Sequence, residues 1–114
     1  MGFKATARES GNITLVDISG QITLGEGSAK LRELLRDLLT KGNSRIILNL
    51  GDVSHIDSSG IGELVSGFNS VRNRGGELKL LNLTKKVHDV MLITKLYTVF
   101  DIHSDENTAV RSFS

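Results

Sequence analysis

An acidic residue and two serines stand together near the middle of the chain, in the run Asp57-Ser58-Ser59-Gly60. A serine at a helix N-terminus can cap the helix, and its phosphorylated form can be held by the same N–H groups. Because a phosphoryl group adds up to two negative charges, this serine could alter a surface without altering the fold. The same residues could equally be helix caps alone, since helix starts favour Asp and Ser.

Motifs for catalysis and cofactor binding are incomplete in this sequence. With Ser58 as nucleophile, a hydrolase elbow would need a glycine where Ile56 stands. After Gly60-Ile61-Gly62, Val65 replaces the third glycine of a dinucleotide-binding motif, and there is no Walker motif. The histidines are scattered, at His55, His88 and His103. We therefore expect no enzymatic activity, no cofactor and no metal site.

Composition places the chain among small globular proteins. Its 114 residues suit a single domain over residues 1–114, and 39% hydrophobic residues with few aromatics imply a core of Leu, Ile and Val. A net charge of +1 gives no case for nucleic-acid binding, and the absence of cysteine excludes disulfides. No apolar run is long enough for a membrane span, and residues 1–10 lack a signal-peptide core, so we expect a cytoplasmic protein.

The first half of the chain predicts a hairpin followed by a strand between two helices. Lys4–Arg8 and Ile13–Ser19 read as antiparallel strands joined by a turn at residues 10–12 and ended by Gly20. Ser28 is the expected cap of a helix with a leucine stripe. Arg45–Leu50, apolar on both faces, predicts a central strand, followed by a loop over Asp52–Asp57.

The second half of the chain continues the alternation. A helix is expected from Ser58 to the Gly75-Gly76 pair, then a strand near residues 78–81 and a helix capped by Thr84. Tyr97–Ile102 reads as a last strand and residues 105–113 as a closing helix. The order ββαβαβαβα predicts an α/β fold with a mixed, mainly parallel sheet, an N-terminal antiparallel hairpin and about four helices.

The segment around Ser58 resembles a known family. Asp57-Ser58-Ser59-Gly60-Ile61-Gly62, preceded by the apolar strand 46–50, is similar to the signature of STAS domains, and most closely to bacterial anti-sigma-factor antagonists. The spacing to Gly75-Gly76-Glu77-Leu78 and to Leu81-Asn82-Leu83 also resembles that family. The resemblance extends over about residues 13–102, and it implies a single STAS-like domain.

The resemblance also implies a function. In such antagonists the serine after the aspartate, here Ser58, is phosphorylated by a GHKL-type serine kinase that is also the anti-sigma factor. The unphosphorylated antagonist binds that partner and so regulates transcription, and a phosphatase restores binding. The residues that the resemblance assigns to partner binding are Gln21, Thr23, Asp57, Ser58, Ser59, Gly60 and Ile61. A weak homodimer is a further expectation.

The sequence departs from the family pattern in one segment. Many antagonists carry two acidic residues in a Gly-Glu-Leu-Asp-like segment after the second strand, whereas this chain has Gly20-Gln21-Ile22-Thr23. Nearby Glu26 could supply a charge from a shifted position. The departure leaves an alternative open, in which the chain is a constitutive STAS subunit of a lipid-transporting ABC complex or a stress-signalling scaffold.

Overall fold

The computed structural model describes residues 2–113, which form strands and helices in the order ββαβαβαβα expected from the sequence. The strands are β1 (Phe3–Ser10), β2 (Ile13–Ile22), β3 (Arg45–Ile56), β4 (Glu77–Leu81) and β5 (Asp101–His103). The helices are α1 (Glu26–Thr40), α2 (Ser58–Asn73), α3 (Lys85–Ile93) and α4 (Glu106–Arg111), with a 3₁₀ turn at Leu96–Thr98.

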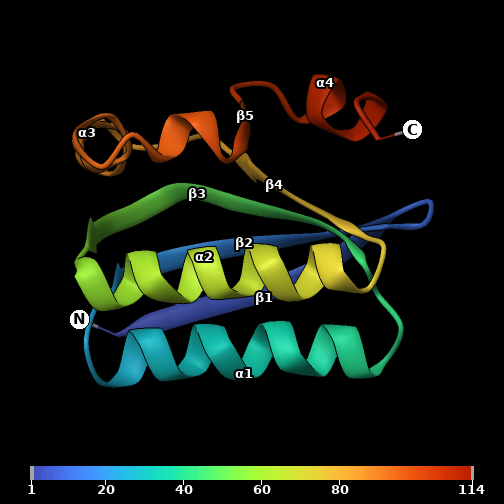
Figure 1. The fold of residues 1–114 in the computed structure, drawn as a ribbon, viewed down its shortest axis with the longest axis horizontal. Coiled ribbons are helices and arrows are strands. Elements are labelled where there is room, and N and C mark those ends of the chain that lie inside the picture. Colours follow the sequence, from blue (N-terminus) through green and yellow to red (C-terminus); the bar gives the residue numbers. More distant parts are fainter. Residues whose placement is uncertain (1, 114) are drawn as a thin grey trace.

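The strands form one mixed sheet in the spatial order β1-β2-β3-β4-β5. β1 and β2 are antiparallel, and the later neighbours are parallel, as predicted. The hairpin between β1 and β2 turns at Gly11, whose φ of 62° lies in the left-handed region that glycine adopts without a steric cost. Parallel neighbours need crossover connections, and α1, α2 and α3 supply them (Figure 1).

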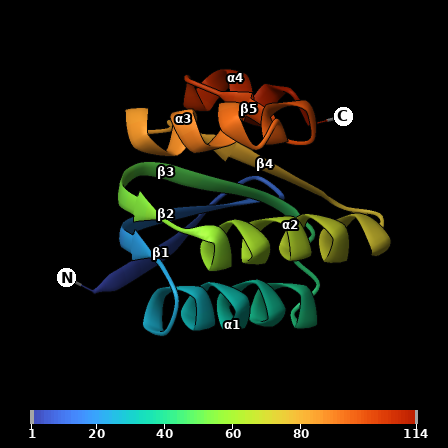
Figure 2. The same cartoon turned by 60° about the vertical axis from the view of Figure 1, so that its left-hand side comes forward.

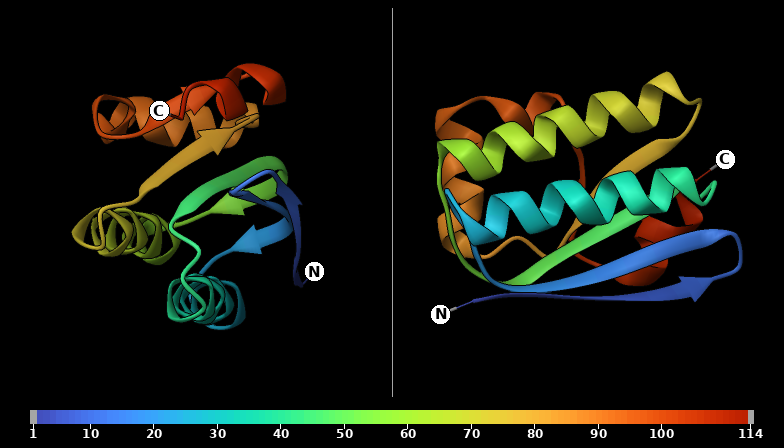
Figure 3. Two further views of the ribbon diagram at one scale, coloured as in Figure 1. Left: turned by 90° about the vertical axis from the view of Figure 1, so that its right-hand side faces the viewer. Right: turned by 90° about the horizontal axis from the view of Figure 1, so that it is seen from below.

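Helices α1 and α2 lie side by side along one face of the sheet (Figure 3). The leucine stripe of α1 packs into a core with Ile46 and Leu48 of β3 and with Leu64 and Val71 of α2. Gly67 of α2 lies so close to Leu35 that an added Cβ would overlap the leucine side chain. The small residue therefore lets the two helices approach each other closely.

A smaller core lies under α4 on the opposite face of β2, β3 and β4. Leu15, Ile47 and Leu81 contribute to it, because alternate residues of a strand point to opposite faces. Lys79 is buried beside this core and donates to Asp101 at 2.8 Å, and its Nζ lies 4.8 Å from the centroid of the Phe113 ring. The sheet thus has helices on both faces (Figure 1).

Three of the predicted boundaries are wrong. β2 does not end at Gly20 but continues to Ile22, because Gly20 takes a φ of 97° at an irregularity in the ladder with β3. Residues 52–56 are not a loop, since β3 runs to Ile56 by pairing with this extended β2. Ser28 is not the cap of α1, because that helix begins at Glu26 with Gly25 as its N-cap.

The last predicted strand is also only partly correct. Residues 96–98 of the segment form a 3₁₀ turn, and the strand is confined to Asp101–His103. Phe100 between them is buried in the main core, where its ring centroid lies 5.2 Å from that of Phe68 in an edge-to-face contact. Thr84 caps α3 as predicted, and α2 is capped by Asp57, whereas the Ser58 hydroxyl, also considered as a cap, makes no capping hydrogen bond to any residue that the structure describes.

Candidate functional site

The loops after β2 and β3 meet at one edge of the sheet. Ile22 and Ile56 are register partners at the ends of these parallel strands, and each strand leads within a few residues into a helix. The N-termini of α1 and α2 therefore lie next to each other at that edge (Figure 2). Carboxyl ends of parallel strands are where α/β proteins usually bind ligands and partners.

Asp57 fixes the junction between the two loops. It is the N-cap of α2, and its Oδ1 accepts hydrogen bonds from the Gly60 N–H at 3.0 Å and from the Ser59 hydroxyl at 2.7 Å. Its Oδ2 accepts from the Leu24 N–H at 2.9 Å, which ties the loop after β2 to the start of α2. The Gly60 and Leu24 N–H groups, with the Ser59 hydroxyl, lower the pKa of Asp57 to about 2.

Ser59 links the two helices. Its Oγ donates to Asp57 and also lies 2.9 Å from the Oγ of Ser28, which is 5% exposed within the first turns of α1. Because the proton of Ser59 is directed to Asp57, Ser28 is the donor in the contact between the two serines. Ser59 is therefore committed to holding the N-termini of α1 and α2 together.

Ser58, unlike Ser59, takes no part in these hydrogen bonds. It is the first residue of α2, its side chain is exposed, and no residue within 2–113 makes a hydrogen bond to its hydroxyl. It lies at the end of the helix where unpaired N–H groups give a partial positive charge. The Ser58 hydroxyl is therefore accessible from solvent.

The other residues predicted for the site fall into two groups. Thr23 lies in the loop that Asp57 holds, and Gln21 is opposite His55 in the β2–β3 ladder, so both border the start of α2. Gly60 is buried, and an added Cβ there would overlap the carbonyl oxygen of Ile22. Ile61 is half-buried and packs against the main core.

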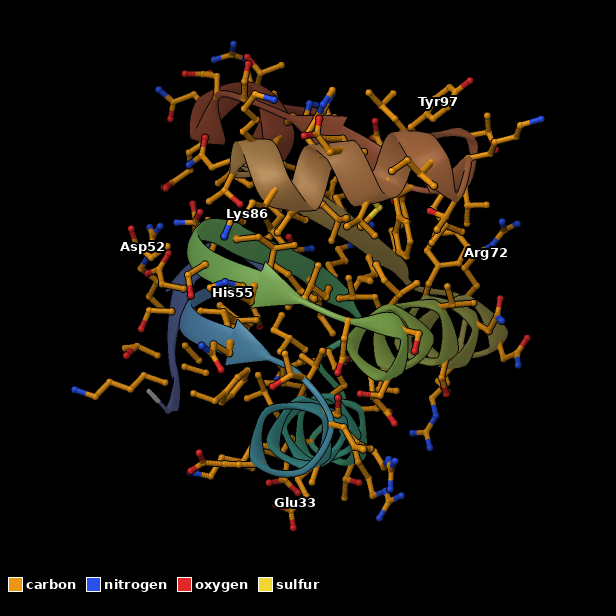
Figure 4. The ribbon with its side chains drawn as sticks, turned by 90° about the vertical axis from the view of Figure 1, so that its left-hand side faces the viewer. Glu33, Asp52, His55, Arg72, Lys86 and Tyr97 are labelled. Atoms are coloured by element: carbon orange, nitrogen blue, oxygen red, sulfur yellow. The ribbon has the colours of Figure 1, made fainter. Side chains whose placement is uncertain are left out.

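Two features of this edge were not predicted from the sequence. Leu24 is 82% exposed beside Asp57, and the only sequence signal for it is an apolar residue directly before Gly25 in a turn. The Nζ of Lys86 on α3 lies 3.1 Å from Nε2 of His55 on β3, and both side chains are on the same side of the molecule (Figure 4). Their distance in sequence, 31 residues, hides this pair.

Among the residues that the structure describes, neither serine is hydrogen-bonded to a base that is free to take its proton. Ser58 has no base within hydrogen-bonding distance among the residues that the structure describes, and Ser59 donates to a carboxylate that already accepts two N–H groups. In residues 2–113 no three side chains of His, Cys, Asp or Glu gather in a way that could hold a metal ion. None of the helices in that range is both long and apolar enough to cross a bilayer.

Comparison with known proteins agrees with the fold. A sequence model described as the STAS domain matches residues 4–109. The chain belongs to the STAS domain family. The sequence is 32% identical to an anti-sigma-B factor antagonist of Bacillus subtilis (strain 168), in an alignment covering 97% of this chain and 100% of the relative.

Solved structures of STAS proteins have the same fold. A putative anti-sigma factor antagonist of Thermotoga maritima matches with a TM-score of 0.87 and 24% identity, covering 94% of this chain and 92% of that one. The Bacillus cell fate determinant SpoIIAA in its phosphorylated form matches with a TM-score of 0.74 and 18% identity, covering 97% and 100%. Because both sequence identities are below 25%, these structural matches establish a shared fold and nothing further.

Proposed function

We propose that this STAS domain is an anti-sigma-factor antagonist whose binding to its partner is switched off by phosphorylation of Ser58. The observation that carries the proposal is the contrast between the two serines. Ser58 is exposed and lacks a protein partner within residues 2–113, whereas Ser59 is engaged by both Asp57 and Ser28. The 32% identity to the anti-sigma-B factor antagonist supports the class of partner.

The docking surface would surround Ser58 at the edge formed by the two loops. Leu24 gives it an apolar contact that is 82% exposed in the free chain, and Gln21, Thr23 and Ile61 border it. Asp57 and Ser59 hold these elements in place, and Gly60 contributes by packing against β2. A partner that covers Leu24 would also remove water from the neighbouring Ser58.

The switch would be electrostatic. Asp57, whose pKa is lowered to about 2, is ionised at neutral pH, so a phosphoryl group on Ser58 would face a like charge. Burying that dianion beneath a docked partner carries a desolvation cost unless cations compensate. A coupling of about 3 kcal/mol between phosphate and partner would weaken binding more than a hundredfold.

The chain would be the substrate of this chemistry and not its catalyst. The expected partner is a GHKL-type serine kinase that is also the anti-sigma factor, and a phosphatase would reverse the modification. All of these proteins would act in the cytoplasm, where the sigma factor works. SpoIIAA, which shares the fold, has been solved in both an unphosphorylated and a phosphorylated form, and this supports a modification of the same kind here.

The proposal is tested by mapping the phosphate. The parent chain, Ser58→Ala and Ser59→Ala are incubated with the cognate kinase and ATP, and the products are analysed by mass spectrometry. We expect phosphate on Ser58 in the parent and in Ser59→Ala, and none in Ser58→Ala. Phosphate on Ser59 in the parent would refute the assignment. A chain that stays unmodified and copurifies with a permease and a transport ATPase would support the constitutive subunit instead.

A further inference from the structure

A groove of about 400 Å³ runs between α1 and α2, on the side of these helices away from the sheet core. Figure 3 shows the two helices side by side along its length. Its lining residues are Arg32, Leu35, Arg36, Leu39, Glu63, Ser66, Gly67, Ser70, Asn73 and Arg74. The volume is within the range of about 300–1,000 Å³ typical of small-molecule sites.

Positive charge is concentrated in this groove. Three of its lining residues are arginines and one is a glutamate, which leaves an excess of two positive charges, whereas the net charge of the whole chain is only +1. Arg32 is paired with Glu63 at 2.6 Å, and Arg74 donates to the carbonyl oxygen of Leu39 at 3.2 Å. Arg36 makes no hydrogen bond or ion pair with any residue of the described range 2–113.

The walls of the groove add neutral hydrogen-bonding groups. Ser66, Ser70 and Asn73 follow one another at helical spacing along α2 and line the groove opposite the α1 arginines. Leu35 and Leu39 form an apolar floor to the groove and are 4% and 7% exposed. The guanidinium, hydroxyl and amide groups of the lining offer hydrogen-bond donors to a ligand in the groove.

We propose that the groove between α1 and α2 binds the phosphate groups of a small phosphorylated ligand. Arginine presents a planar fork of donors that matches phosphate oxygens, and hydroxyl and amide groups can complete the contacts. A ligand with at least two negative charges would balance the excess of positive charge in the lining. The site is separate from Ser58, so it stands or fails independently of the phosphorylation switch.

The experiment titrates inorganic pyrophosphate into the full chain at about 0.1 M salt, with binding followed by calorimetry and by amide chemical shifts. Arg36→Gln should weaken binding about tenfold, the effect of losing roughly 1.4 kcal/mol of charge-assisted hydrogen bonding. Ser70→Leu, which adds bulk to the groove at an exposed helical position, should weaken it similarly. Thermal unfolding of each variant checks that it is folded.

The matched control is Lys4→Gln, which removes the same charge from β1, outside the groove. At this salt concentration a distant surface charge is largely screened, so its effect should stay within about twofold. Equal weakening by Arg36→Gln and Lys4→Gln, or no binding at millimolar pyrophosphate, would overturn the proposal. Vesicles containing phosphatidic acid then distinguish the ligand source: sedimentation with them that depends on Arg36 assigns a lipid headgroup, and its absence assigns a free phosphate.

Discussion

The hydroxyl groups of Ser28 and Ser59 lie 2.9 Å apart and join the start of α1 to the start of α2. Ser59 in turn donates to Asp57, whose other carboxylate oxygen holds the loop before α1. This chain of hydrogen bonds fixes both loops around Ser58 without using the Ser58 hydroxyl. The residues that hold the loops in place are therefore distinct from Ser58, the residue proposed to be phosphorylated.

Removing the hydroxyl of Ser59 should destabilise the fold. In Ser59→Ala the buried Ser28 hydroxyl loses its acceptor and Asp57 loses a donor, so we expect the free energy of unfolding to fall by about 1–3 kcal/mol. Urea denaturation measures the change. Ser58→Ala is the matched control and should stay within about 0.5 kcal/mol of the parent, as for an exposed surface site. Equal losses in the two variants would contradict the division of roles between the serines.

Asp57 should make stability depend on acid pH. Its pKa is lowered from 3.8 in the unfolded chain to about 2, so the ionised carboxylate stabilises the fold above pH 3.8. That contribution is lost as pH falls from 3.8 toward about 2, because protonation then becomes favourable in the folded state too. Asp57→Asn should show a smaller loss of stability than the parent over this interval.

Urea titrations of the parent and of Asp57→Asn at several pH values between neutral and acid measure this effect. Other carboxylates titrate in both proteins, so the relevant quantity is the difference between the two stability curves. The difference in stability between the two proteins should be greatest at neutral pH and should shrink as the pH falls from 3.8 toward about 2. Parallel curves would show that Asp57 is not held ionised by its N–H partners.

Gly60 should be intolerant of any side chain. An added Cβ would overlap the carbonyl oxygen of Ile22 and would also meet the Ile56 side chain, so Gly60→Ala should destabilise by about 1–3 kcal/mol. Gly62 is the control, since an added Cβ there meets nothing within 4 Å. Gly62→Ala should instead stabilise α2 by up to about 1 kcal/mol, through helix propensity. Thermal unfolding compares the two, and equal signs would refute the packing role of Gly60.

Much of the fold could be predicted from the sequence because its elements carry strong local signals. The leucine stripe predicts α1, the apolar run at residues 46–48 predicts the central strand, and Asp57-Ser58 predicts the start of α2. The extension of β3 to Ile56 could not be predicted in this way. Residues 52–55 include Asp, Ser and His and lack an apolar run, and they become a strand only by pairing with β2.

For the candidate site, the sequence indicates the position but not the role of each residue. The Asp-Ser-Ser-Gly run indicates where it lies, but the run alone does not separate the roles of Ser58 and Ser59. That distinction depends on Ser28, which is 31 residues away and was expected to be a helix cap. The exposure of Leu24 likewise follows from how the β2–α1 loop is held by Asp57, a contact between residues 33 apart.

The central claim is that a phosphoryl group on Ser58 abolishes partner binding while the fold is unchanged. Calorimetric titration of the purified anti-sigma factor with unmodified chain and with chain phosphorylated at Ser58 tests it most directly, with kinase-treated Ser58→Ala as control. We predict at least about a hundredfold weaker binding for the phosphorylated chain, with stability within about 1 kcal/mol of the unmodified form. Equal affinity of the two forms, or a loss of binding accompanied by unfolding, would contradict the account.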